Sequence, residues 1–398
     1  MNTMEQEVRK ELTENILPFW MNVMPDGADG FIGRIDGTGG RCPDAERGAV
    51  LNARILWTFA AAWRMFKVEE YRETAETAYR YIAAHFIDRE YGGVYWSLNP
   101  DGTPKDSRKQ FYAIAFMIYA LAEYYAAVGD ESALKEAVEL FLCIEEHSLD
   151  RVDGGYLEAC TRDWGIIGDM RLSDKDQNDA KSMNTHLHVL EAYTGLYRVW
   201  RDAELGSALR KIIRLFLDRI VCNDGHLGLF FNEKWQPRST MLSYGHDIEA
   251  SWLLCEAASV LGYEPLMSDV RKVSEMMAEA SMEGFTTDSG MEYEYDPGTG
   301  YCNRSREWWV QAETVVGCLN QFRLSGDRIW KDRSLAAWGF IRKNIICPHG
   351  EWYWSAIPDG DSFRPDTAND RAGFWKCPYH NGRMCMMVLL CIENLQYC

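Results

Sequence analysis

The stretch "YGGVYWSLNPDG" (91–102), continued by "QFYAIAFMIYALAEYYAAVGD" (110–130) and "ESALKEAVELFLCIEEH" (131–147), decides the fold of this chain. A glycine-rich turn with aromatic residues comes first. The middle stretch is apolar nearly all round, which is typical of a buried helix, and the last stretch is amphipathic, which is typical of a helix on the outside. Gly129 and Asp130 separate the two, as expected for the end of one helix and the N-cap of the next.

This unit recurs along the chain. Glycine-rich turns followed by aromatic residues occur six times, at intervals of about 60 to 71 residues, which indicates an internal repeat. The other five turns are "DGFIGRIDGTGG" (29–40), "DGGYLEA" (153–159), "DGHLGLFFNEKW" (224–235), "DSGMEYEYDPGTG" (288–300) and "PHGEWYWSAIPDG" (348–360). Each unit is therefore a short hairpin or loop, an apolar helix, a tight turn and an amphipathic helix.

The order of the helices predicts a closed ring. Inner helices are expected to start near 47, 108, 181, 245, 306 and 378, and outer helices near 4, 69, 131, 204, 264 and 328. The first outer helix has no inner partner before it, and the last inner helix has no outer partner after it, so a ring would pair the two ends of the chain. We predict one all-α domain over residues 1–398, an (α/α)6 barrel with short β-hairpins at one mouth. A linear helical solenoid is the alternative.

Composition excludes several classes of function. The 398 residues carry a net charge of −18, which opposes binding to nucleic acid or to an anionic membrane. The N-terminus contains acids and no continuous apolar run, and "LWTFAAAW" and "MMVLLCI" are too short to span a bilayer. Twelve cysteines are scattered without a CxxC pair, which fits reduced thiols. We expect a soluble cytoplasmic protein.

Polar residues in the first turns of the predicted inner helices mark a pocket, because so many polar groups would not remain unpaired in a dry core. Asn184 and His188 are four residues apart and share a face, whereas His186 is about 200° from His188 and is expected to be structural. Other pairs on one face are His246 with Glu249, Trp309 with Glu313, and Arg47 with Arg54.

The last inner helix adds a third histidine in "WKCPYHNGRMC" (375–385). Pro378 suits the first helical position, which makes Cys377 the expected N-cap and places His380 in the first turn. Cys385 is about 140° from His380 round the helix, so the two cysteines are expected to be bystanders rather than metal ligands.

Three functional classes use a pocket of this kind. Metal-dependent hydrolysis or isomerisation would use the histidines as ligands. Glycoside hydrolysis would need two opposed carboxylates, for which Glu249 and Glu313 are candidates. Proton transfer at a carbon beside a carbonyl suits histidine, and His246 and His380 lie at helix starts, where the macrodipole disfavours the charged form.

Fifteen tryptophans favour a sugar as the substrate, because aromatic rings stack on sugar faces. Trp96, Trp164, Trp235, Trp308, Trp354 and Trp375 are expected in loops or at helix starts, with about half of them filling the core. Nucleotide-binding motifs are absent from the sequence.

The segments "ARILW", "MNTHLHVLEAY", "SYGHDIEA", "WWVQAE" and "WKCPYHNGRMCM" resemble the N-acylglucosamine 2-epimerase family, most closely its cellobiose 2-epimerase branch. The resemblance covers essentially the whole chain and implies an (α/α)6 barrel. It also implies reversible C2 epimerisation of the reducing-end glucose of β-1,4-linked disaccharides such as cellobiose, lactose or mannobiose, without a cofactor or metal. N-acylglucosamine and mannose remain alternative substrates. We expect a monomer or a weak homodimer.

The resemblance also implies roles for individual residues. His246 and His380 would be the acid/base pair at C2, and His188 would assist ring opening and stabilise the enediolate. Glu249 would orient or pair with His246. The implied substrate contacts are Arg54, Tyr112, Asp176, Asn184, Glu249, Trp309, Glu313 and Trp375.

Overall fold

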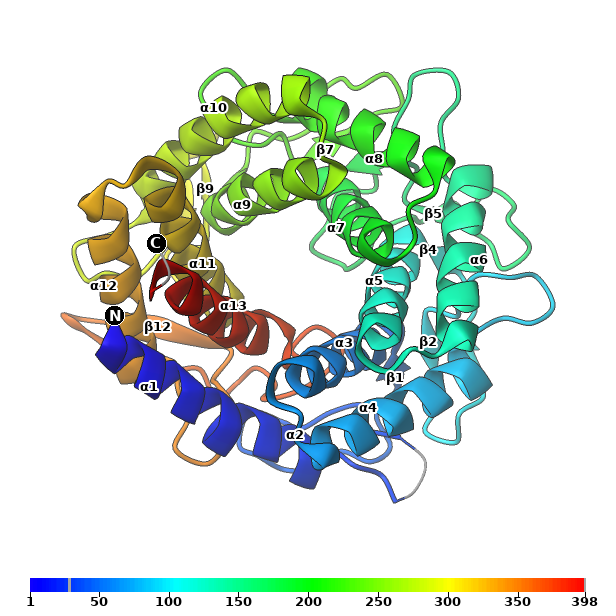
Figure 1. The fold of residues 1–398 in the computed structure, drawn as a ribbon, viewed down its shortest axis with the longest axis horizontal. Helices are drawn as coiled ribbons and strands as arrows, with labels where there is room; N and C mark the ends of the chain where they lie inside the picture. Colours follow the sequence, from blue (N-terminus) through cyan, green and yellow to red (C-terminus); the bar gives the residue numbers. More distant parts are fainter. Residues whose placement is uncertain (28–29, 397–398) are drawn as a thin grey trace.

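The computed structural model describes residues 1–27 and 30–396 as two concentric rings of helices (Figure 1). The inner ring consists of α3 (Ala49–Phe66), α5 (Phe111–Val128), α7 (Met183–Val199), α9 (Tyr244–Leu261), α11 (Trp308–Ser325) and α13 (Tyr379–Gln396). The outer ring consists of α1 (Asn2–Lys10), which continues through η1 (Glu11–Ile16) into α2 (Leu17–Asn22), then α4 (Glu69–Tyr81), α6 (Glu131–His147), α8 (Ala203–Leu215), α10 (Glu264–Ser281) and α12 (Arg328–Asn344). The predicted (α/α)6 barrel is confirmed.

Local chemistry fixes the turns between inner and outer helices. Gly129 and Gly326 adopt left-handed conformations, with φ of 77° and 71°, where a side chain would be strained. The Asp130 carboxylate accepts from the backbone N–H groups of Ser132 and Ala133, and Asp327 caps α12 in the same way. The sequence prediction of these helix ends is confirmed.

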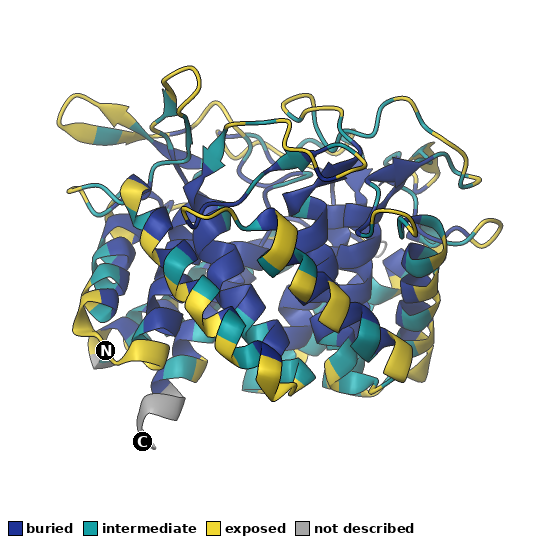
Figure 2. Ribbon diagram, turned by 90° about the horizontal axis from the view of Figure 1, so that it is seen from above, coloured by how far each residue is buried: buried dark blue, intermediate teal, exposed yellow. Residues whose placement is uncertain are grey.

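Short strands gather at one mouth of the barrel, above the helices in Figure 2. Five inner helices follow a two-residue strand: β1 (Arg47–Gly48), β4 (Lys109–Gln110), β6 (Lys181–Ser182), β8 (Leu242–Ser243) and β11 (Arg306–Glu307). Each pairs antiparallel with a strand of the next hairpin along the chain, namely β2 (Ser97–Leu98), β5 (Ala159–Cys160), β7 (Phe230–Phe231), β9 (Glu294–Asp296) and β12 (Ser355–Asp359). Three sheets gain a third strand from β3 (Pro104–Asp106), β10 (Tyr301–Asn303) and β13 (Ser362–Pro365). These pairings link successive repeats.

At most of the hairpins, an ion pair with a buried lysine or arginine attaches the turn to the segment that leads into an inner helix. The pairs are Lys109–Asp88 (2.8 Å), Lys181–Asp150 (2.7 Å), Arg306–Asp288 (3.1 Å) and Lys376–Glu351 (2.7 Å). Arg47 forms the equivalent pair with Asp26, so it lies before α3 and not on the same helical face as Arg54. Because one partner of each pair precedes an inner helix, these contacts fix where the first turns of the inner ring sit.

The two ends of the chain close the ring. Helix α1 packs against α13, and Ile35 forms a β-bridge with Ala372. The Trp352 indole donates to Glu11 (2.7 Å), and the Trp20 indole donates to Glu351 (2.6 Å). The ring closure predicted from the helix order is confirmed, and the solenoid alternative is wrong.

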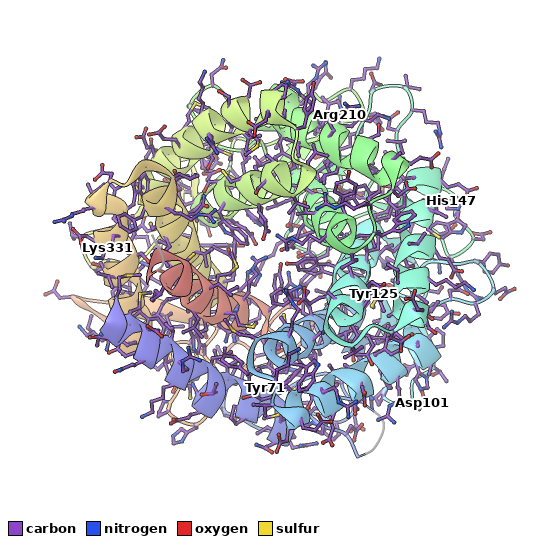
Figure 3. The ribbon with its side chains drawn as sticks, in the orientation of Figure 1. Tyr71, Asp101, Tyr125, His147, Arg210 and Lys331 are labelled. Carbon is purple, nitrogen blue, oxygen red and sulfur yellow. The ribbon has the colours of Figure 1, made fainter. Side chains whose placement is uncertain are left out.

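The prediction that no segment is long and apolar enough to cross a bilayer overlooked α5. Phe111–Val128 meets that test by length and composition, and 72% of this window is buried inside the protein. Its apolar character follows from its place in the inner ring, where side chains fill the space between the two layers of helices (Figure 3).

The start of α13 differs by one residue from the prediction. The Pro378 carbonyl accepts the first helical hydrogen bond, from Gly382 N–H at 3.0 Å. Pro378 is therefore the N-cap, and Cys377 precedes it. His380 remains in the first turn, as predicted.

Candidate active site

A cavity of about 430 Å³ opens at the hairpin mouth of the barrel. Ten of the eleven predicted site residues line it, namely Arg54, Tyr112, Asp176, Asn184, His188, His246, Glu249, Trp309, Trp375 and His380. Glu313 does not reach the cavity and lies behind His380. His186 is also outside, where its ring accepts from Tyr156 N–H at 2.9 Å and contacts the Ser182 carbonyl oxygen. The convergence of the inner helices on one pocket is as predicted.

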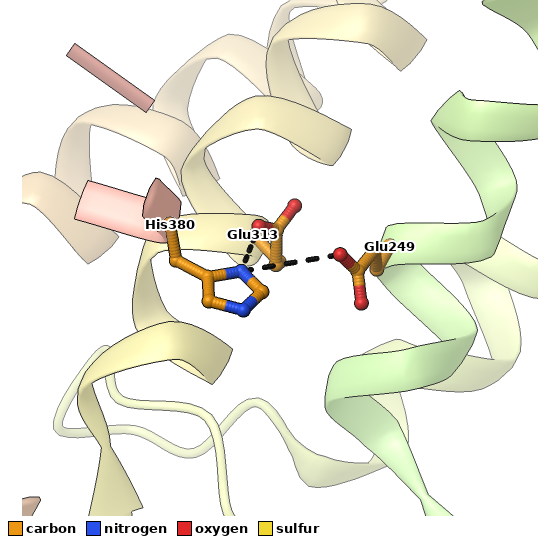
Figure 4. A group of neighbouring side chains, drawn as sticks. All are labelled: Glu249, Glu313 and His380. Carbon is orange, nitrogen blue, oxygen red and sulfur yellow. Dashed lines mark hydrogen bonds and ion pairs between the residues drawn. The ribbon is translucent and has the colours of Figure 1, made fainter. Parts of the chain in front are cut away.

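His380 is held by a carboxylate. Its Nδ1 lies 2.7 Å from Glu313 Oε1 and 3.9 Å from Glu249 Oε1 (Figure 4). Burial would raise the pKa of Glu313, but Arg383 and His380 outweigh it and lower that pKa to about 2. Burial lowers the pKa of His380 to about 3 despite its bond to Glu313. The resting imidazole is therefore neutral, with Nδ1–H donating to Glu313 and Nε2 unprotonated.

His246 has a different partner. Its Nδ1 lies 2.7 Å from the Ser243 hydroxyl, which precedes α9, and its ring centroid is 4.7 Å from that of Trp309. Burial, with the neighbouring His188 and His380, lowers the pKa of His246 to about 3. The expectation that Glu249 pairs with His246 is wrong, because Glu249 instead accepts a hydrogen bond from Arg383 Nη2 at 2.9 Å.

His188 is the third histidine of the cavity. Its Nδ1 lies 3.0 Å from Glu191 Oε2, and its ring packs against Tyr112 and Phe116. Burial lowers the pKa of His188, so this imidazole is also neutral, with an unprotonated Nε2.

Arg54 supplies positive charge to the cavity. Its guanidinium donates to the Tyr112 hydroxyl (3.1 Å) and to the Trp375 carbonyl (3.3 Å), and lies 4.1 Å from the Phe116 ring centroid. Within residues 1–27 and 30–396, no ion pair joins Arg54 to a carboxylate. A buried cation of this kind favours an anion in the cavity. Cys377 is more than a bystander, because its Sγ contacts Arg54 Nη1 at 3.6 Å.

The rim of the cavity is aromatic. Trp308, Trp309, Trp354 and Trp375 all line it, and the Trp309 indole donates to Glu307 at 2.9 Å. Asp176 belongs to a loop over the cavity and accepts from the backbone and hydroxyl of Ser173. Trp164 and Trp235 lie outside and pack on His147 and His186, as expected for tryptophans that fill the core.

Comparison with known proteins assigns the family. Residues 30–375 match the family described as N-acylglucosamine 2-epimerase (GlcNAc 2-epimerase). The chain belongs to the N-acylglucosamine 2-epimerase family. The match ends before His380, so the assignment of this third histidine to the site rests on its geometry in the cavity.

Two relatives and two structures extend this family assignment. The chain is 53% identical over 389 residues to a cellobiose 2-epimerase of Bacteroides fragilis, covering 97% of this chain and 98% of that protein. It is 37% identical to one of Ruminococcus albus, with the same coverage. The structure of cellobiose 2-epimerase from Bacillus thermoamylovorans has a TM-score of 0.93, with 36% identity over 98% of this chain and all of that one. A D-mannose isomerase structure, at 19% identity over 98% of this chain and 97% of that one, shares the fold with a TM-score of 0.83.

Two other chemistries considered from the sequence fit this family member poorly. Atoms of Glu249, Glu313 and His380 lie within 4.8 Å of one another, a spacing that suits a metal. However, Arg383 donates to both carboxylates, at 2.9 and 2.7 Å, and occupies the place of a cation. The same contacts place both carboxylates on one arginine, whereas glycoside hydrolysis needs two carboxyl groups on opposite sides of the bond.

Sequence reasoning missed the buried cluster beneath the histidines. Arg383 pairs with Glu191, Glu249 and Glu313, and the Tyr379 hydroxyl donates to Glu191. Its signal was present, since Arg383 is four residues after Tyr379 and three after His380, on one side of α13. Loop residues that line the cavity, Leu172 to Lys175, Tyr293, Glu307 and Asn369, carried no periodic signal.

Proposed function

We propose that this protein is a cellobiose 2-epimerase, which reversibly epimerises C2 of the reducing-end glucose in β-1,4-linked disaccharides. The observation that carries the proposal is a pair of neutral imidazoles, His246 and His380, which come from two inner helices, both contact Trp309 and both line one cavity. Epimerisation beside a carbonyl needs one acid/base group on each face of a planar intermediate. Relatives named cellobiose 2-epimerase at 53% and 37% identity support the same activity.

Ring opening is assigned to His188. With Nδ1–H donating to Glu191, the Nε2 of His188 is free to accept the proton of the O1 hydroxyl. As the C1–O5 bond breaks, C1 becomes an aldehyde and His188 passes the proton taken from O1 to O5, which restores the neutral imidazole. This step makes the C2 proton acidic enough for imidazole to remove it.

Proton transfer at C2 is assigned to the other two histidines. Both imidazoles are neutral at rest, so the pair first takes up one proton from solvent. The imidazole that stays neutral takes the C2 proton and leaves a cis-enediolate, and after rotation about C2–C3 the other, now imidazolium, delivers its proton to the opposite face. The two rings therefore share one transferable proton, and the reverse reaction exchanges their roles. Arg54 stabilises the enediolate oxygens, because it is a buried cation whose charge no carboxylate neutralises among the described residues.

The rim of the cavity favours a disaccharide over a monosaccharide. A reducing-end sugar would lie against Trp309 and Trp375, and a second sugar would reach Trp308, Trp354 and the loop that carries Asp176. Lactose and mannobiose present the same reducing-end hydroxyls. We further propose that the enzyme works in the cytoplasm, as a monomer or weak homodimer without a cofactor, on disaccharides that arise from mannan or cellulose.

The test is incubation with cellobiose in D₂O, followed by NMR of the products. We expect glucosyl-mannose with deuterium at C2, and an epimer without deuterium would refute proton transfer with the solvent. His380→Asn should lower kcat by about 10³-fold or more, since general acid/base catalysis contributes typically 10²–10⁴-fold. The control is His349→Asn, at an exposed histidine outside the cavity, which should retain activity.

Parallel incubations with mannose and N-acetylglucosamine test the other activities of the family. A D-mannose isomerase of Marinomonas mediterranea is 21% identical to this chain. An isomerase returns the proton to C1 and makes a ketose, whereas an epimerase returns it to C2. Faster turnover of mannose than of cellobiose, with a ketose as product, would overturn the proposal.

A further inference from the structure

Arg383 is a buried cation directly beneath the cavity. It comes from α13, three residues after His380, and its side chain is 2% exposed. Its guanidinium contacts carboxylates from three other inner helices: Glu191 on α7, Glu249 on α9 at 2.9 Å and Glu313 on α11 at 2.7 Å. Arg383 does not line the cavity, so it acts on a substrate only through its neighbours.

Two of these carboxylates hold histidines. Glu191 Oε2 lies 3.0 Å from His188 Nδ1, and Glu313 Oε1 lies 2.7 Å from His380 Nδ1. One guanidinium thus lies behind two of the three imidazoles. On Glu313 it donates to Oε1, the oxygen that faces His380, and on Glu191 it donates to Oε1 while His188 faces Oε2.

We propose that Arg383 is a positioning residue that keeps Glu313 ionised and thereby fixes which nitrogen of His380 carries the proton. An ionised carboxylate only accepts hydrogen bonds, so Nδ1 of His380 must carry the proton and Nε2 stays free. A protonated Glu313 would donate to Nδ1 instead. The imidazole proton would then move to Nε2, and the nitrogen in the cavity would lose its lone pair.

The surroundings of Glu313 make Arg383 the decisive partner. Helix α9 contributes Glu249, whose pKa is raised well above its usual range by burial and by the charge of Glu313, His246, which is neutral, and Trp252, whose indole donates to Glu313 Oε2 at 3.0 Å. Helix α13 contributes His380 and Arg383. Burial favours the protonated form of Glu313, so the charge of Arg383 together with its hydrogen bond to Glu313 decides the balance. The pKa of Glu313, which is lowered to about 2, agrees with this.

The fork of the guanidinium is needed because its partners lie in different directions. Nη1 faces Glu191 and the Tyr379 hydroxyl, while Nη2 faces Glu249 and Glu313. The guanidinium carbon lies 4.7 Å from the Trp252 ring centroid, and Tyr119 of α5 is a further titratable neighbour. An ammonium group at position 383 has the same charge but cannot contact all three carboxylates.

The first test needs no substrate. In ¹⁵N-histidine NMR of the wild-type protein, with His380 assigned from the spectrum of His380→Asn, we expect a proton on Nδ1 of His380 from about pH 5 to pH 9. In Arg383→Lys we expect the proton on Nε2 at about pH 6 and its return to Nδ1 at alkaline pH, as Glu313 ionises. A wild-type His380 with its proton on Nε2 overturns the proposal, as does an unchanged spectrum in the variant.

The second test is the pH profile of kcat/KM for cellobiose, and this arm rests on the proposed function. Because loss of Arg383 raises the pKa of Glu313, the acidic limb of Arg383→Lys should move upward to the alkaline pH at which the NMR titration shows Glu313 ionising, a loss of ~100-fold at about pH 6 that recovers at high pH. Trp252→Phe, which removes one donor to Glu313, should move the limb in the same direction but less. Trp252→Phe also tests the proposal if Arg383→Lys does not fold.

Arg306→Lys is the matched control. Arg306 is a buried arginine with two carboxylate neighbours, Asp288 and Glu292, outside the cavity. It should lower stability without moving the pH profile. Equal loss of activity at every pH in Arg383→Lys would indicate a purely structural role and refute the proposal. If the wild-type enzyme leaves cellobiose unchanged, the proposed function fails, whereas the NMR test still decides the role of Arg383.

Discussion

Replacing Glu351 by glutamine should destabilise the barrel at the point where its ends meet. Glu351 Oε1 accepts from Lys376 Nζ (2.7 Å), Asn381 Nδ2 (2.5 Å) and the Trp352 backbone (2.9 Å), while Oε2 accepts from the Trp20 indole (2.6 Å). Trp20 lies near the start of the chain, and Lys376 and Asn381 flank His380. One carboxylate therefore joins the first outer helix to the segment that presents a proposed catalytic base.

The cost of the substitution follows from the burial of the ion pair. The side chains of Lys376 and Glu351 are both 0% exposed. Glutamine keeps an oxygen acceptor but leaves the ammonium without a counter-charge, and breaking a buried pair in this way costs about 3–5 kcal/mol. Since domains are typically stable by ~5–15 kcal/mol, the variant should lose about a fifth of its stability or more.

The stability of Glu351→Gln should also change with pH in a direction that can be worked out. Burial already lowers the pKa of Lys376, with Glu351 opposing that shift. Without Glu351 the folded-state pKa of Lys376 falls further below its unfolded value. The folded variant then binds fewer protons than the unfolded chain between these two values, so its stability rises with pH across that window. The deficit of Glu351→Gln relative to wild type should therefore shrink as the pH rises toward the lowered folded-state pKa of Lys376 in the wild-type protein.

Urea unfolding measures the free energy of unfolding of the wild type, Glu351→Gln, Lys376→Met and the double variant. The double variant removes the unpaired charge, so we expect it to be more stable than Glu351→Gln alone. A cost below about 1 kcal/mol for Glu351→Gln, or strict additivity of the two substitutions, would show that the pair does not hold the ring closed.

Two further predictions concern Arg54 and Glu158. Arg54→Lys should lower kcat by about 10²–10³-fold, the usual cost of losing an oriented donor to a developing oxyanion, and initial rates that change only in KM would contradict this. Glu158 accepts from Ser182 N–H and the Thr185 hydroxyl, and burial raises its pKa to about 8. The folded state therefore holds an extra proton between about pH 4.5 and 8, and stability should fall as pH rises through this window. Glu158→Gln, which resembles the protonated acid, should flatten that fall in urea unfolding, and an unchanged slope would refute the assignment.

The fold could be predicted from the sequence because its signals are local. Gly129 ends a helix and Asp130 starts the next through contacts within three residues, and the same chemistry returns at Gly326 and Asp327. The alternation of apolar and amphipathic helices is also a local signal, because each helix carries it in its own sequence in every repeat. Cys377 was misplaced as the N-cap because a proline suits either the cap or the first helical position, and only the hydrogen bond from Gly382 decides.

Only those parts of the site that depend on spacing within one helix could be predicted from the sequence. Asn184 and His188 share a face of α7, and both reach the cavity. Spacing along a helix does not reveal which groups meet across the barrel, so Glu249 was paired with His246 on its own helix, whereas it binds Arg383, 134 residues away in sequence. The charge of an arginine beside three carboxylates outweighs proximity along the chain.

The two proposed acid/base histidines differ in a way that the reaction can use. Nδ1 of His380 faces a carboxylate, which stabilises an imidazolium, while Nδ1 of His246 faces the Ser243 hydroxyl, which donates or accepts with equal ease. When the pair holds its single transferable proton, that proton is therefore favoured on His380. His246 then removes the C2 proton while Ser243 accepts from its Nδ1, and His380 protonates the opposite face. The reverse direction must begin with the proton on His246, so the serine hydroxyl and the Glu313 carboxylate together set which face of C2 is attacked first.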